Sequence, residues 1–84
     1  MSYEIEITQK AGKEFLKLPA TWQEKARDKI LSLEDNPRPA GSKKLKNTPF
    51  FRVRTGNYRI IYFINEEKRV IKILAIGHRK DVYR

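Results

Sequence analysis

The sequence predicts a small α+β fold in the order β-α-α-β-β-β, with a helical hairpin on one face of a curved antiparallel sheet. Residues 3–7 alternate apolar and charged side chains, as a half-buried strand does. Residues 9–34 carry apolar side chains at helical spacing in two segments that Pro19 separates. Residues 50–76 hold three apolar segments joined by two short turns, which is typical of an antiparallel meander. With 84 residues, we expect one domain over residues 1–84.

Two short helices are expected after the first strand. Thr8 can cap the first helix, which Pro19 ends. Its apolar stripe is predicted to consist of Ala11, Phe15 and Leu18. The segment 21–24, Thr-Trp-Gln-Glu, matches a capping box and predicts the start of the second helix, which should run to about Glu34. The apolar face of this helix should comprise Trp22, Ala26, Ile30 and Leu33. Because the link is short, the helices should form an antiparallel pair.

A basic loop is predicted between the second helix and the meander. Residues 35–48 hold two prolines and Gly41, followed by a run of lysines. The lysines that could follow a phosphate backbone are Lys43, Lys44 and Lys46. The alternative is that these three side chains are only solvated, as charge runs usually are.

The segment 50–62, FFRVRTGNYRIIY, predicts a hairpin that gathers three arginines. Gly56 followed by Asn57 matches a two-residue type II′ turn. The resulting register pairs Arg54 with Arg59, Val53 with Ile60 and Arg52 with Ile61. One face should then belong to the core, with Phe51, Val53, Ile60 and Tyr62. The other face should carry Arg52, Arg54 and Arg59. Opposed like charges cost roughly 0.2–1 kcal/mol per pair, so the cluster indicates a site for a polyanion.

The last strand is expected over Val70–Ile76, after a turn at residues 65–68. A four-residue loop would place Tyr62 opposite Ile71 and Ile60 opposite Ile73. Gly77 should break the strand. We expect three residues that follow it to lie on the arginine face or at its rim: His78, Arg79 and Tyr83.

Composition narrows the functional classes. Nineteen Lys and Arg against ten Asp and Glu give a net charge of +9, the electrostatic footprint of a nucleic-acid binder. An affinity for anionic membranes or for an acidic protein partner would also fit this charge. Without cysteine and with one histidine, we expect no metal site and no cofactor. No apolar run approaches a membrane span, and the amino terminus lacks signal-peptide features, so a cytoplasmic protein is expected.

Arginines can hold phosphate and stabilise charge that develops during phosphoryl transfer. They stay protonated at neutral pH and are poor general bases. If the face is catalytic, the candidates for proton transfer are therefore His78 and Tyr83. The 2′-hydroxyl of RNA would supply the nucleophile. The alternatives are that His78 is a turn residue and that Tyr83 caps the edge of the core. Spacing alone indicates an anion-binding face without establishing catalysis.

Two motifs identify a family. The segments GNYRIIY (residues 56–62) and GHRKDVY (residues 77–83), with the opening Tyr-x-Ile-x-Ile strand and the FLKLP segment at residues 15–19, resemble the RelE branch of the RelE/ParE toxin superfamily. The resemblance covers nearly the whole chain. It implies a compact α+β toxin that a RelB-like antitoxin, a separate chain with an amphipathic acidic helix, neutralises. It also implies a ribosome-dependent endoribonuclease that cuts mRNA in the ribosomal A site.

The resemblance also implies residue roles. Arg59 matches the family arginine that binds the scissile phosphate, and Arg79 matches the one that neutralises charge in the transition state. Tyr83 matches the terminal tyrosine that orients the substrate base. Arg52 and Arg54 stand where studied members have two lysines, which leaves proton transfer to His78 or Tyr83. The alternative function is a non-catalytic, ParE-like toxin that inhibits DNA gyrase. A domain that only binds ribosomal RNA is a third possibility.

Overall fold

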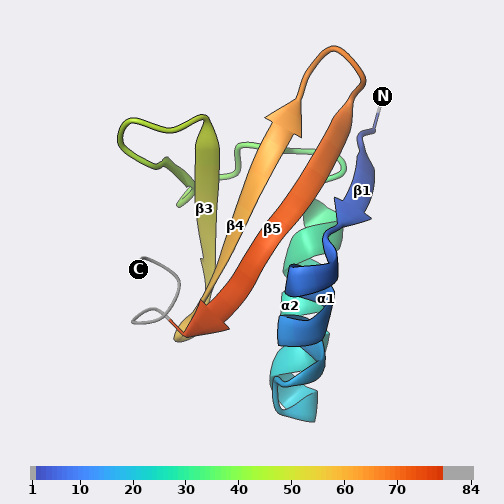
Figure 1. Cartoon of the computed structure of the whole chain (residues 1–84), viewed down its shortest axis with the longest axis vertical. Coiled ribbons are helices and arrows are strands. Elements are labelled where there is room, and N and C mark those ends of the chain that lie inside the picture. Colours follow the sequence, from blue (N-terminus) through green and yellow to red (C-terminus); the bar gives the residue numbers. More distant parts are fainter. Residues whose placement is uncertain (1, 79–84) are drawn as a thin grey trace.

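The computed structural model describes residues 2–78 and places two helices against one face of a five-stranded sheet (Figure 1). The elements are β1 (Glu4–Ile7), α1 (Gln9–Leu16), α2 (Ala20–Ser32), β2 (Lys43–Lys44), β3 (Phe50–Thr55), β4 (Tyr58–Asn65) and β5 (Val70–His78). The strand order across the sheet is β1-β5-β4-β3-β2. The connection after α2 passes behind β4 and β5 on its way to the β3 side (Figure 1). The α+β class is confirmed.

The sheet is mixed, so the prediction of a fully antiparallel sheet is wrong for one pair of strands. β1 runs parallel to β5, with Ile5 opposite Ile71 and Ile7 opposite Ile73. Alternation in a sequence assigns side chains to faces and carries no information on strand direction. The predicted loop also contains the short strand β2, which pairs antiparallel with β3.

The helices start and end close to where the sequence places them, with one error at a cap. The Thr8 Oγ1 accepts a hydrogen bond from the Ala11 amide at 3.1 Å, as predicted for the cap of α1. The predicted capping box is wrong, because α2 begins at Ala20 and Thr21 lies inside it. Gln23 instead donates from Nε2 to the carbonyls of Leu16 and Leu18, at 3.1 and 3.0 Å. These bonds satisfy carbonyls that the end of a helix leaves without partners.

The β3–β4 hairpin has the predicted register throughout. Thr55 pairs with Tyr58 and Arg54 with Arg59 around the turn. Gly56 has φ of 62°, as the first central residue of a type II′ turn requires. A Cβ at Gly56 would clash with the Trp22 ring, so the site excludes larger residues for a second reason.

The register of β4 with β5 differs from the prediction. Tyr62 lies opposite Ile73 and Ile60 opposite Ile76. β4 continues to Asn65, which moves the turn along the chain, and a β-bulge between Ile61 and Tyr62 adds one residue to β5. The bulge lets both Ile73 and Ile76 face the helices, and both are buried.

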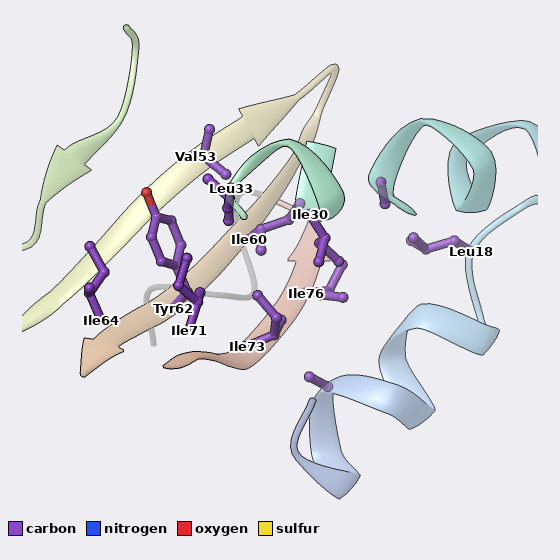
Figure 2. Packing of buried hydrophobic residues seen from close by; sticks show 12 residues of the cluster. Leu18, Ile30, Leu33, Val53, Ile60, Tyr62, Ile64, Ile71, Ile73 and Ile76 are labelled. Atoms are coloured by element: carbon purple, nitrogen blue, oxygen red, sulfur yellow. The ribbon is translucent and has the colours of Figure 1, made fainter. Parts of the chain in front are cut away.

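The core lies between the helices and the inner face of the sheet. Figure 2 shows its side chains meeting from β3, β4, β5 and α2. Tyr62 is fully buried, and its hydroxyl donates to the carbonyl of Pro37 at 2.7 Å. Burial raises the pKa of the Tyr62 hydroxyl above its usual value. Within residues 2–78, no helix combines the length and apolar character needed to cross a membrane.

Candidate functional site

The three predicted arginines share the outer face of the sheet, which is the face turned away from the helices. Arg54 lies directly opposite Arg59 in the hairpin, and Arg52 lies opposite Ile61. Strand alternation turns their neighbours Val53 and Ile60 inward, where both are buried. The register of one hairpin therefore brings the three guanidinium groups together, although their mutual repulsion opposes it.

Arg52 is the most unusual member of the cluster. Only 6% of its surface is exposed, and its Nε is buried without a hydrogen-bond partner. The ion pairs among the described residues are Lys10–Glu14 and Arg38–Glu66, so Arg52 has no carboxylate to offset its charge. Burying a cation without a counter-charge is unfavourable. Arg54, in contrast, is exposed, and Arg59 is half-buried.

The three predicted lysines do not act as one group. Lys43 lies in β2 directly opposite Arg52 and so adds its charge to the outer face. Lys44 lies opposite Phe51, which belongs to the inner face. Lys46 is exposed in the turn that follows β2. Of the three, Lys43 has the position closest to the arginine cluster.

His78 ends β5 on the helix side of the sheet. It lies opposite Tyr58, with ring centroids 6.1 Å apart and nearly perpendicular rings. It also lines a cavity of about 310 Å³ with Glu14 and Lys17 of the helix layer. The bulge in β5 explains this placement, because one added residue reverses the facing of every later side chain. The structure thus separates His78 from the arginines, whereas Arg79 and Tyr83 lie outside the described residues.

A basic cleft that the sequence reading missed lies along the open edge of β3. It has a volume of about 380 Å³, and its lining includes Lys29, Gly41, Lys43, Arg52 and Arg54. Lys29 is half-buried and comes from α2. The sequence contained one signal for Lys29, namely its position on the helix. Lys29 follows the buried Ala26 by three residues and so borders the apolar stripe.

An apolar groove lies between β1 and the helices. Its volume is about 450 Å³, and its lining includes Ile5, Ile7, Phe15, Ile30 and Leu31. Ile7 and Leu31 are about half exposed, at 50% and 48%. Within residues 2–78, no three His, Asp or Glu side chains gather in a way that could hold a metal ion.

The fold and its outer face define a small basic α+β protein with a cluster of arginines on one face of its sheet. The sequence matches the family described as the ParE toxin of the type II toxin–antitoxin system parDE, over residues 5–83. The chain belongs to this family of toxins, and relatives named as RelE toxins are also similar to it.

The mRNA interferase toxin RelE of Escherichia coli K12 is 30% identical over 88 residues, which cover 99% of this chain and 92% of that protein. The putative toxin RelE1 of Methanocaldococcus jannaschii is 31% identical, with coverages of 100% and 98%. Among solved structures, the archaeal RelE–RelB complex from Pyrococcus horikoshii matches with a TM-score of 0.84 and 31% identity, over 98% of this chain and 100% of that chain.

Proposed function

We propose that this toxin is an endoribonuclease that cuts mRNA in the ribosomal A site. The observation that carries the proposal is the cluster of Arg52, Arg54 and Arg59 on the outer face. The 30% identity to a relative named mRNA interferase supports it. Folding alone gives no reason to place arginines opposite each other across a hairpin, whereas the binding of a phosphodiester would favour this arrangement.

In the proposed reaction, the 2′-hydroxyl of the substrate attacks the adjacent phosphorus. The bond to the 5′-oxygen of the next nucleotide breaks, which leaves a 2′,3′-cyclic phosphate and a 5′-hydroxyl. Arg59 would hold the scissile phosphate through its planar fork, and Arg79 would neutralise charge that builds up on the phosphate oxygens. Arg52 and Arg54, with Lys43, Lys44 and Lys46, would bind the flanking phosphates.

Proton transfer would fall to Tyr83 or His78, because arginine stays protonated. The position of His78 beside Tyr58, on the helix side, argues against its direct contact with a phosphate held at Arg59. Tyr83 would also stack on the substrate base. A site with strong charge and weak acid–base groups would depend on the ribosome to position the substrate, since positioning alone can supply a large part of a rate enhancement.

We also propose a RelB-like antitoxin as the partner chain. The similar structures from Pyrococcus horikoshii and Escherichia coli are RelE complexes with RelB. The apolar groove at β1 offers half-exposed Ile7 and Leu31, and the edge of β1 away from β5 has no neighbouring strand among the described residues. An amphipathic helix of the antitoxin would cover these side chains, and its acidic residues would face the basic surface of the toxin.

The alternative function is inhibition of DNA gyrase by binding. It is favoured by the family match, whose description names the ParE toxin. In that case the basic outer face would grip a protein or DNA partner without chemistry.

A cell-free translation reaction with a defined mRNA tests the proposal. Primer extension should reveal new 5′ ends inside A-site codons when ribosomes are present, and none with the same mRNA alone. Arg59→Ala should lower the cleavage rate by about 100-fold or more, because it removes charge stabilisation at the phosphate. Lys68→Ala, in the exposed β4–β5 turn, is the matched control and should cut normally.

Intact mRNA with normal translation would refute the nuclease proposal and direct attention to a gyrase supercoiling assay. Intact mRNA with blocked translation would instead indicate a toxin that occupies the ribosome without cutting.

A further inference from the structure

We propose that the basic cleft is a discrete phosphate site that grips the RNA strand beside the scissile position, with Lys29 as one of its ligands. This inference rests on the proposed function, because it takes RNA as the substrate. The cleft lies at the edge of β3 that faces away from β4, so it adds a second binding element beside the arginines of the outer face. Among the described residues, four cationic side chains line the cleft: Lys29, Lys43, Arg52 and Arg54.

Within residues 2–78, no acidic side chain balances the charge around the cleft. None of these four side chains forms an ion pair in the described part of the chain, where the acidic partners Glu14 and Glu66 serve other residues. No carboxylate is among the described residues that line the cleft. Arg52 is 94% buried and keeps a buried Nε without a partner. A bound anion would relieve both the repulsion and the desolvation cost of this cluster.

Three separate elements build the site. α2 contributes Lys29 from the helix layer, the segment before β3 contributes Gly41 and Lys43, and β3 contributes Arg52. β2 pairs only with Phe51 and Arg52, so the edge of β3 beyond Arg52 has no neighbouring strand within residues 2–78. The cleft opens at this edge, and Gly41, which has a φ of 91°, brings bare backbone to its wall.

The location distinguishes the cleft from the scissile position. Arg59 lies on β4 and does not line the cleft. Neighbouring strands are about 4.8 Å apart, so an anion beyond the edge of β3 lies about two strand spacings from β4. Arg54 faces outward between the two and pairs with Arg59. A single RNA strand that crosses the outer face could therefore place one phosphate at Arg59 and a neighbouring phosphate in the cleft.

A phosphodiester fits better than the carboxylate of a protein partner. Four cations around one cavity exceed what a single carboxylate would neutralise, whereas an RNA strand brings successive charges. The continuity with Arg54 and Arg59 also favours a ligand that extends along the face.

The test uses a short single-stranded RNA in which every 2′-hydroxyl is methylated, so that cleavage is impossible. Its affinity is measured against salt concentration, and each phosphate contact on a single strand contributes a slope of about −0.7. Lys29→Gln should weaken binding and reduce the magnitude of the slope by about 0.7. Lys43→Gln, at an exposed position, should give the same loss and guards against a folding defect at Lys29. Lys68→Gln is the charge-matched control and should leave the slope unchanged.

Inorganic phosphate provides a second arm, with the amide signal of Gly41 as the reporter. The oligonucleotide should displace the phosphate from this signal in the wild type. The proposal is overturned if Lys29→Gln and Lys43→Gln both behave as Lys68→Gln does. It is also overturned if phosphate moves the Gly41 signal but the oligonucleotide does not compete, which would mean an adventitious ion only. If these variants bind an acidic antitoxin more weakly while their RNA binding stays intact, the cleft is a site for a carboxylate instead.

The outcome is independent of cleavage. If the wild type never cuts mRNA but Lys29→Gln loses one phosphate contact, the cleft proposal stands and the proposed function is refuted. A protein that cuts mRNA normally but shows no change in Lys29→Gln would lose the cleft and keep the function.

Discussion

Replacing Arg52 by methionine should stabilise the free protein while weakening its hold on phosphate. Methionine keeps the apolar stem of the side chain but removes a charge that is 94% buried and has no ion-pair partner within residues 2–78. Exchanging buried ionic groups for apolar ones of similar volume often stabilises a protein by about 1–4 kcal/mol. The adjoining cleft of about 380 Å³ admits water to part of the guanidinium, so we expect the lower end, about 1–2 kcal/mol.

Urea unfolding of the free protein, with and without added phosphate, measures both effects. The wild type should gain stability with phosphate, because a ligand that binds only the folded state shifts the equilibrium toward it. Arg52→Met should be more stable than the wild type without phosphate, and it should gain less stability when phosphate is added. Arg54→Met, at an exposed position, should change stability by less than about 0.5 kcal/mol. If Arg52→Met is less stable than the wild type and still gains the full stabilisation from phosphate, then Arg52 is a packing residue and the reasoning fails.

Three other predictions concern the turn, the groove and the core. Gly56→Ala should cost about 2–4 kcal/mol in urea unfolding, because a positive φ and a clash with Trp22 add together; Gly41→Ala, with a positive φ and open space, should cost only about 1–2 kcal/mol, and equal costs would contradict the role of Trp22. Leu31→Glu should weaken antitoxin binding at least tenfold in calorimetry and leave mRNA cutting intact, whereas unchanged affinity would remove the apolar groove from that interface. Burial raises the pKa of Tyr62, so its contribution to stability is complete below the unfolded value near 10 and is lost as pH rises through the folded value; Tyr62→Phe should flatten this alkaline decline, and an unchanged decline would show that other groups cause it.

The parts of the fold that local signals control were predictable from sequence. Gly56 determined the turn, so the register of β3 with β4 and the shared face of Arg52, Arg54 and Arg59 followed. The Thr8 cap was equally local. The direction of β1 was not predictable, because alternation is the same in parallel and antiparallel pairs.

The errors came from features that depend on contacts between distant segments. The bulge at Ile61 and Tyr62 leaves no local signature, and it changed both the β4–β5 register and the facing of His78. The apparent capping box at Thr21 failed because Gln23 bonds back to the end of α1 instead. Lys29 was missed because its cleft is assembled from three elements far apart in the chain.

The bulge in β5 determines which side chains at the end of the strand lie on the outer face and which lie on the helix side. Side chains before the bulge lie on the face that strict alternation assigns to them, whereas side chains after it lie on the opposite face. Leu74 is the extra residue, because it has no partner on β4, so deleting it would remove the bulge and leave Gly77 opposite Arg59 and His78 opposite Tyr58. When this chain is compared with relatives, a one-residue gap at Leu74 is therefore expected to leave the facing of the residues at the end of β5 unchanged, because it removes only the residue that has no partner on β4.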